Sequence, residues 1–230
     1  MLNILSWNIR QGGGIRISKI LAALRQQDPE IIVLSEYHNG KAGVQLRNGL
    51  LQAGYRYQGV STAPARQNSA AIFSKLPCNL LIFPDCDENF PDNLVGAEYE
   101  AFTLLGMYLP HKKKHKLLDF LLRYIQDNPK PAILVGDFNT GINGVDQAGK
   151  SFWYEDEMKS FPKYGYHDAF RHVHGMKKEY SWYSHQGNGY RYDHTYVADS
   201  LLSITSACEY LHSWREEGLS DHSPMLLSLG

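Results

Sequence analysis

The chain has 230 residues, of which 43% are hydrophobic and 20% charged, and its formal net charge is -1 at pH 7. These values are ordinary for a globular protein, and the length allows a single domain. Because the charge is nearly balanced, nothing global favours a nucleic acid or an anionic membrane, so any polyanion has to be bound by a local cluster.

The cysteines and the apolar runs indicate the compartment. The cysteine count of three is odd, and no cysteine has the spacing of a zinc site, which favours a reduced, intracellular setting. The N-terminal segment lacks the charged region of a signal peptide. No apolar stretch approaches the roughly 20 residues that cross a bilayer. We therefore expect a soluble, cytoplasmic protein that does not contact membranes.

Strand and helix patterns alternate at the start of the chain. Alternating apolar residues predict a strand at 2–8, and helical spacing predicts a helix over 17–27 that ends before Pro29. A β-rich run predicts another strand at 30–37. Four more strands are expected at 69–75, 79–84, 95–100 and 101–110. Such a strand-rich stretch argues against a plain doubly wound parallel sheet.

Helical spacing returns at 115–128, and this segment leads into a predicted strand at 132–137. A further helix is expected at 153–161. The last third predicts strands at 180–184, 189–197, 201–211 and 223–229. No linker, low-complexity segment or repeat interrupts this order. We predict one domain over 1–230, an α/β fold of two packed sheets with helices outside.

Polar residues mark the ends of several apolar strands. They are Asn8, Glu36, the pair Asp137 and Asn139, and the pair Asp221 and His222, which precedes a strand. Turn or cap roles would explain any one motif alone, but Glu36 is not a turn former. Oxygen ligands without thiolates suit hard cations, chiefly Mg²⁺ or Mn²⁺. Because such a metal polarises a phosphoryl oxygen while a free carboxylate activates water, the set predicts hydrolysis of a phosphate ester.

The ordered motifs resemble a known superfamily. SWNIR, LSEY, GMYLPH, GDFNT, GYRYDHTYV and LSDHSP occur in the order and at the approximate spacing of the endonuclease/exonuclease/phosphatase superfamily, also called the DNase I-like fold. The resemblance runs from Leu5 to Pro224, and the ordered set is far more specific than any one segment. It implies a four-layer α/β/β/α sandwich, in which two mixed β-sheets pack face to face.

The resemblance also implies a role for each matching residue near the metal. Glu36 resembles the principal ligand of Mg²⁺ or Mn²⁺, with Asn8 and Asp221 facing the same metal region. Asp137 matches the residue that orients or deprotonates the attacking water. Asn139 would hold both Asp137 and a phosphate oxygen.

Two further residues match the acid and histidine of the family. His222 resembles the histidine that stabilises charge on the phosphoryl oxygen, and Asp193 resembles its partner acid. A carboxylate in that position would set the tautomer of the imidazole and favour its cationic form.

Residues on the substrate side resemble the exonuclease III and abasic-site endonuclease branch. In that branch the tyrosine of the GMYLPH segment, here Tyr108, lies near the scissile phosphate, and His111 replaces the usual amide. Arg171 falls in an Asp-x-Phe-Arg segment of the same branch, and on this resemblance we expect Arg171 to contact the substrate.

Three aromatic residues fall where this branch lines a pocket for a flipped-out abasic sugar. They are Trp182, Tyr190 and Tyr192. Ordinary strand packing is the alternative, because aromatic residues favour strands, and base stacking is a further use. The short segment 183–189 does not favour strong abasic-site specificity. The glycines of RQGGGIR are interpreted as a flexible turn rather than a phosphate loop.

The run HKKKHK at 111–116 places cations at the start of a predicted helix, where the helix dipole favours anions. This conflict favours a functional use. We expect Lys112 and Lys113, together with Lys114, to follow a nucleic-acid backbone.

The sequence therefore favours a metal-dependent phosphodiesterase that cuts DNA, in endonuclease or exonuclease mode and with a place in DNA repair. RNA stays open as a substrate, and no obligate protein partner is evident. One alternative keeps the catalysis and changes the substrate to a small phosphoester, such as a phosphoinositide or a nucleotide. Another is a binding module without catalysis, but no catalytic residue is missing.

Overall fold

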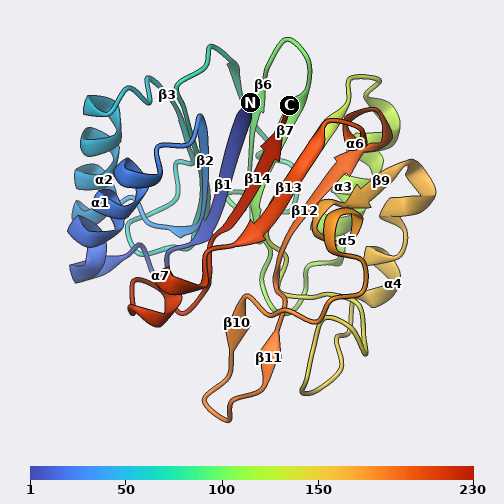
Figure 1. Ribbon diagram of the computed structural model, residues 1–230. Coiled ribbons are helices and arrows are strands. Elements are labelled where there is room, and N and C mark those ends of the chain that lie inside the picture. The colour runs from blue at the N-terminus through green and yellow to red at the C-terminus, as the bar shows by residue number, and fades with distance from the viewer.

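The computed structural model describes residues 1 to 230, and its long strands form two six-stranded sheets (Figure 1). The first sheet has the order β13-β14-β1-β2-β4-β3. Its strands are β1 (Leu2–Asn8), β2 (Ile31–Tyr37), β3 (Tyr57–Val60), β4 (Ser69–Ser74), β13 (Thr205–Tyr210) and β14 (Met225–Leu229). β1 and β2 are parallel, so both carry the chain toward the same edge of the sheet.

The second sheet has the order β5-β6-β7-β8-β12-β9. Its strands are β5 (Asn79–Ile82), β6 (Leu94–Glu98), β7 (Thr103–Tyr108), β8 (Ala132–Asp137), β9 (Tyr166–Asp168) and β12 (Asp193–Ala198). β7 and β8 are parallel, and β12 is antiparallel to β8. Two short strands, β10 (Trp182–Tyr183) and β11 (Gly189–Tyr190), form a hairpin that projects from one end of the molecule (Figure 1).

Helices cover the outer faces of the sheets, except that α5 (Ala169–His174) and α6 (Asp199–Leu202) bury apolar residues in the core between the two sheets. The other helices are α1 (Ile17–Gln27), α2 (Lys41–Gln52), α3 (His115–Asp127), α4 (Glu155–Met158) and α7 (His212–Glu216), with 3-10 turns η1 (Gly14–Arg16) and η2 (Phe161–Tyr164). α1 and α2 lie on the first sheet and α3 on the second (Figure 1). The predicted four-layer α/β sandwich is thus confirmed. None of the helices combines the length and apolar character needed to cross a membrane.

Alternation along each strand explains the layers. On β1, Ile4 packs between the sheets and Leu5 packs toward α1 and α2. On β8, Val135 packs between the sheets and Leu134 packs toward α3. Side chains of this kind contribute about 1.5–3 kcal/mol each when fully buried. A slip of one residue would exchange the two faces, so the apolar pattern fixes the register of the strand ends.

Most predicted elements are present, and the helix over 17–27 has the predicted bounds. The predicted strand at 201–211 was wrong at its start, because the chain is still helical up to Leu202. The predicted helix at 153–161 was also too long, since only the single turn of α4 and the turn η2 form there.

Four helices and two short strands were not predicted from the sequence: α2, α5, α6, α7, β3 and β9. α2 contains Gly43 and Gly49, which lower helix propensity. Both glycines are buried at close contacts, because a Cβ at Gly43 would lie 2.0 Å from the carbonyl oxygen of His38. Packing against neighbouring elements therefore overrides a weak local preference for helix.

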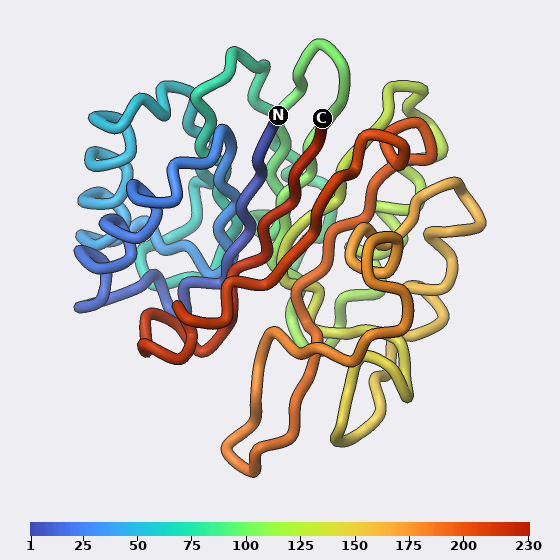
Figure 2. The backbone as a smooth tube through the Cα atoms, in the orientation of Figure 1, coloured from blue at the N-terminus to red at the C-terminus, as the bar shows by residue number.

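The strand ends that carry polar residues meet at one edge of the sandwich. The chain termini lie at the other end, where Leu2 pairs with Leu229 (Figure 2). Tyr108 pairs with Asp137 across the parallel strands, and Asp137 in turn pairs with Asp193. The site is therefore built from the ends of β1, β2, β7 and β8 and from the start of β12.

A buried ionic network fastens the second sheet beside this edge. Arg191 is fully buried, and its Nε lies 2.7 Å from Asp146 Oδ1 while its Nη2 lies 2.5 Å from Asp168 Oδ2. Burial opposes the charged form of both acids, but the guanidinium outweighs it and holds the pKa of Asp146 and of Asp168 below the ordinary value. Arg171 also contacts Asp146. The network ties β9 to the loop that follows β8.

Acid should weaken the fold through these carboxylates. Because their folded pKa is depressed, their contribution to stability is present above the unfolded pKa of about 3.9 and is lost as pH falls below it. Arg191→Met should lower the free energy of unfolding by about 3–5 kcal/mol at neutral pH, since Asp146 and Asp168 stay buried without the guanidinium that they share. Urea titrations should show that the difference in free energy of unfolding between the unmodified protein and Arg191→Met becomes smaller toward pH 3. The same difference in free energy of unfolding at every pH would contradict this account. Arg56→Met is the control, because Arg56 is exposed.

Candidate active site

Three residues at the strand ends adopt left-handed backbone conformations although none is glycine. Glu36 has φ 54°, Asn139 has φ 49° and Arg10 has φ 53°. Such conformations cost roughly 1–3 kcal/mol each and gather at functional sites. Here each one turns the chain sharply at the end of an apolar strand, so that the polar side chains converge on one edge.

Asn8 joins the two principal acids of the site. Its Nδ2 donates to Glu36 Oε1 at 3.1 Å and to Asp137 Oδ2 at 2.8 Å. The other side of Asn8 is fixed too, because its Oδ1 accepts from the Arg10 amide at 2.8 Å. The Gln11 amide donates to Glu36 Oε2 at 2.8 Å. Both β1 and the turn after it therefore orient the Glu36 carboxylate.

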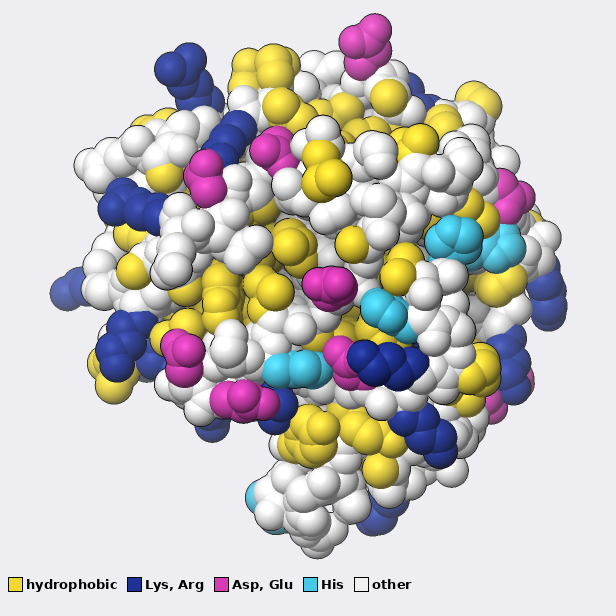
Figure 3. All heavy atoms as spheres, viewed as in Figure 1, with side chains coloured by type: hydrophobic (Ala, Val, Ile, Leu, Met, Phe, Trp, Pro, Cys, Tyr) yellow, Lys and Arg dark blue, Asp and Glu magenta, His cyan; other side chains and the backbone are white.

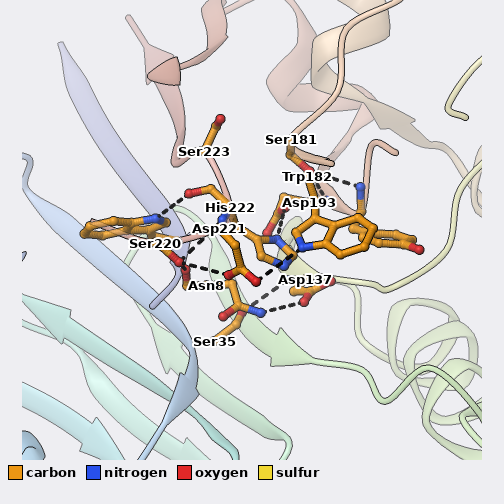
Figure 4. Close-up of polar contacts among 12 residues, drawn as sticks. Asn8, Ser35, Asp137, Ser181, Trp182, Asp193, Ser220, Asp221, His222 and Ser223 are labelled. Atoms are coloured by element: carbon orange, nitrogen blue, oxygen red, sulfur yellow. Dashed lines mark hydrogen bonds and ion pairs between the residues drawn. The ribbon is translucent and has the colours of Figure 1, made fainter. Parts of the chain in front are cut away.

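Asp137 is buried and surrounded by hydrogen-bond donors (Figure 4). Its Oδ1 accepts from the Asn139 amide at 2.8 Å, and its Oδ2 accepts from Asn139 Nδ2 at 3.1 Å. Burial, with the neighbouring Asp193 charge, raises the pKa of Asp137 above its ordinary value. A carboxylate with a raised pKa is a better proton acceptor than an ordinary aspartate.

His222 and Asp193 form a second buried pair beside Asp137. His222 Nδ1 lies 2.8 Å from Asp193 Oδ2, and the backbone oxygen of His222 accepts from the Trp7 indole at 2.9 Å. Burial disfavours the imidazolium, but the charge and hydrogen bond of Asp193 outweigh it and raise the pKa of His222 to about 10. The imidazole is therefore cationic at neutral pH.

Asp193 has one oxygen without a partner. Its Oδ1 is buried and makes no hydrogen bond, while its Oδ2 bonds His222. Ligand atoms of Asp137, Asp193 and His222 all lie within 4.8 Å of one another. These two aspartates and the histidine therefore form a cluster that could hold a metal ion at this edge.

The donor set decides which residues of the cluster suit a hard cation. His222 is cationic at neutral pH, so both ring nitrogens carry a proton and the imidazole is a poor ligand. Glu36 is half-buried and the Asp221 side chain is 36% exposed, which leaves carboxylate oxygens accessible. Oxygen ligands of this kind fit Mg²⁺ or Mn²⁺. Asp221 also accepts from the Trp182 indole at 3.3 Å (Figure 4).

Tyr108 ends β7 beside Asp137. Its hydroxyl accepts from Asn68 Nδ2 at 3.2 Å, which leaves the phenol hydrogen free to donate. Burial raises the pKa of Tyr108 well above its ordinary range, so the phenol stays protonated at neutral pH. Asn68 was not among the predicted residues, because it lies in a loop without a motif of its own.

Two of the three predicted aromatic residues, Tyr190 and Tyr192, line a cavity beside the site, and Trp182 packs against both. Tyr190 and Tyr192 stack with ring centroids 5.3 Å apart, and Trp182 lies 5.5 Å from Tyr192. The His111 ring meets Tyr192 edge-on at 5.3 Å. Tyr190, Tyr192 and His111 border a cavity of about 260 Å³ that Asn139 also lines. An apolar patch lies where the hairpin joins the body of the molecule (Figure 3).

The basic run divides into exposed and buried lysines. Lys112 and Lys113 are exposed, and Lys112 Nζ lies 5.1 Å from the centre of the Trp153 ring beside the cavity. Lys114 is fully buried, so the expectation that it follows a nucleic-acid backbone was wrong. Its Nζ donates to the carbonyl oxygens of Phe138 and Asn139 at 2.6 and 2.8 Å. Lys114 thus stabilises the turn that carries Asn139.

Arg171 does not join the cluster of catalytic side chains. Its guanidinium contacts Asp146 and the carbonyl oxygens of Gly175 and Lys177. These contacts fasten α5 to the loop after β8.

The fold and this edge are those of a class of hydrolases that act on ester bonds, and here both packed sheets supply the candidate catalytic groups. The chain belongs to the endonuclease/exonuclease/phosphatase family, whose sequence pattern matches residues 5–222. The predicted superfamily is therefore confirmed, and so is a hydrolase acting on ester bonds.

Individual relatives agree with this assignment. The chain is 25% identical over 229 residues to an exodeoxyribonuclease of Bacillus subtilis, covering 87% of this chain and 89% of that protein. An AP endonuclease from Archaeoglobus fulgidus superimposes with a TM-score of 0.84 at 21% identity, covering 100% of this chain and 99% of that one. A 3′ phosphatase from Neisseria, solved with a product DNA hairpin, gives 0.86 at 19% identity and full coverage of both chains.

Proposed function

We propose that this protein is a divalent-metal-dependent phosphodiesterase that cuts the DNA backbone. The observation that carries the proposal is the pairing of Asn8, Glu36 and Asp137 on one side of the edge with Asp193 and His222 on the other. An accessible acid, a buried acid and a buried imidazolium surround one space. This arrangement suits an anionic ester attacked by water.

Asp137 would orient the attacking water and take its proton. Its two oxygens are held by donors from Asn8 and Asn139, so the carboxylate keeps one orientation while the substrate changes. Fixed orientation of this kind contributes to catalysis because no reorganisation is needed in the transition state.

His222 would stabilise the charge that develops on the phosphoryl oxygen. The Asp193 carboxylate bonds Nδ1 and leaves Nε2 as the donor toward substrate. Tyr108, with its free phenol hydrogen, is placed to donate to a neighbouring phosphate oxygen.

A divalent cation would be held by Glu36 together with Asn8 and Asp221. When bound, Mg²⁺ or Mn²⁺ neutralises phosphate charge and polarises the phosphoryl oxygen. The backbone N–H of Gln11 and the side-chain amide of Asn8 orient the Glu36 carboxylate for this task.

DNA is the substrate that the cavities and relatives favour. The stacked tyrosines and Trp182 offer aromatic faces to a nucleotide next to the scissile phosphate. Lys112 and Lys113 are exposed cations at the same rim, suited to phosphate contacts. The relatives described above include an exodeoxyribonuclease and a structure with bound DNA.

Incubation with end-labelled DNA tests the proposal. Plain, nicked and abasic duplexes and single strands, with a matching RNA strand, should be incubated in Mg²⁺, Mn²⁺ or EDTA. We expect cutting that requires the metal, and the product ladder identifies endonuclease or exonuclease mode. Hydrolysis of a generic phosphodiester without cutting of any DNA would overturn the DNA assignment and favour a phosphoinositide or nucleotide substrate.

A further inference from the structure

A second hollow borders the site on the side of the first sheet, away from the aromatic cavity. It has a volume of about 500 Å³ and is lined by Gln11, His38, Arg66 and Asn68. All four side chains are polar, and none is acidic. The hollow is therefore unsuited to an apolar group and free of carboxylates on its walls.

Arg66 supplies an uncommitted cation to this hollow. It is exposed and forms no ion pair or side-chain hydrogen bond in the structure. Its backbone is left-handed, with φ 74°, an unusual conformation for a residue other than glycine. A guanidinium presents a planar set of donors that matches a phosphate in bidentate geometry.

The opposite wall of the hollow is a left-handed turn after β1. Five consecutive residues, 10–14, have positive φ, and the side chain of Gln11 from this turn lines the hollow. Gly12 packs against His38, because a Cβ there would lie 2.7 Å from His38 Cβ. The turn therefore brings Gln11 and His38 together on one wall.

A chain of hydrogen bonds connects the hollow with the catalytic groups. His38 Nε2 lies 2.6 Å from Asn68 Oδ1, and Asn68 Nδ2 donates to the Tyr108 hydroxyl. Because the Asn68 oxygen can only accept, His38 Nε2 is the donor. The Gln11 amide bonds Glu36 from the same side. A ligand in the hollow would therefore contact Asn68, which bonds Tyr108, and Gln11, which bonds Glu36.

We propose that this hollow binds a phosphate of the DNA backbone next to the scissile one, with Arg66 as its principal contact and Gln11 and His38 beside it. The inference rests on the proposed function and extends it. The catalytic edge would lie between two subsites, an aromatic one for a nucleoside and a polar one for a neighbouring phosphate. Binding there would also fix Asn68 and, through it, Tyr108.

Binding measurements in a non-cutting background test the phosphate site. Fluorescent duplex DNA should be titrated with the Asp137→Asn protein, with and without Arg66→Ala, over a series of salt concentrations. Loss of one phosphate contact should lower the slope of log K against log salt by about 0.9. Arg66→Lys should keep the slope, since it keeps the charge. Exposed Arg56→Ala, in the turn before β3 and outside the hollow, is the matched control.

Neutral linkages locate the phosphate. A single methylphosphonate placed at successive positions should weaken binding to the parent protein at one position near the cleavage point and leave the Arg66→Ala protein unaffected there. An unchanged salt slope, or the same set of sensitive positions in the Arg66→Ala protein as in the parent protein, overturns the inference while DNA cutting by the unmodified protein upholds the proposed function. If the unmodified protein neither binds nor cuts DNA, both are overturned.

Discussion

Asp137→Asn is expected to lower the rate of phosphodiester cleavage roughly 10³-fold without unfolding the protein, within the range typical for loss of a general base. The amide cannot take a proton from water. It keeps the size of the carboxylate, and it removes the unfavourable burial of a charge. The new side-chain NH₂ group will face a hydrogen-bond donor of Asn8 or Asn139, so a small change in stability is also expected.

Single-turnover cleavage and thermal unfolding should be measured on the same protein samples. Asp127→Asn is a suitable control, because Asp127 is exposed at the end of α3 and makes no side-chain hydrogen bond. Cleavage within tenfold of the unmodified protein would remove Asp137 from the role of base. Unfolding at ordinary temperature would instead show that its burial is structural.

Strand ends were the part of the site that could be predicted from the sequence. Asn8, Glu36 and Asp137 each follow an apolar run, and parallel pairing of neighbouring strands brings such ends to one edge. The partnership of Asp193 with His222 came from the family resemblance, and the two side chains do form a pair. The catalytic roles of these residues stay predictions.

The supporting residues could not be predicted in the same way. In the sequence, Lys114 is one cation of a charged run. Only the fold shows that its ammonium donates to the carbonyl oxygens of Phe138 and Asn139. Asn68 and Arg66 lie in a loop with no periodic pattern, and their neighbours come from the turns after β1 and β2 and from β7. Contacts between distant segments leave no local signal, so this layer of the site is visible only in three dimensions.

The same limit applies to Arg191. In the sequence it is one residue of an aromatic strand pattern, yet it is fully buried between Asp146 and Asp168. Burial of an arginine destabilises a fold unless its charge is paired. The two acids beside Arg191 therefore explain why this side chain can be buried. Arg171 was expected to contact substrate, and its bond to Asp146 makes a supporting role the better hypothesis.

Asp193→Asn is expected to lower cleavage at about pH 8 by 10²-fold or more, because the charge of His222 depends on its partner. The Asp193 carboxylate opposes the effect of burial and raises the pKa of His222 to about 10. Without that charge, burial dominates and the pKa falls, so the imidazole becomes neutral at a lower pH. The alkaline limb of the pH–rate profile should therefore move toward acid.

The titration of the imidazole gives a direct test of this dependence. In metal-free protein, the ¹³C-labelled ring of His222 should titrate at high pH in the unmodified chain and at clearly lower pH in Asp193→Asn, with His222→Gln used to assign the signal. If the rate falls while the titration of His222 stays the same, Asp193 acts by positioning the ring rather than by charging it.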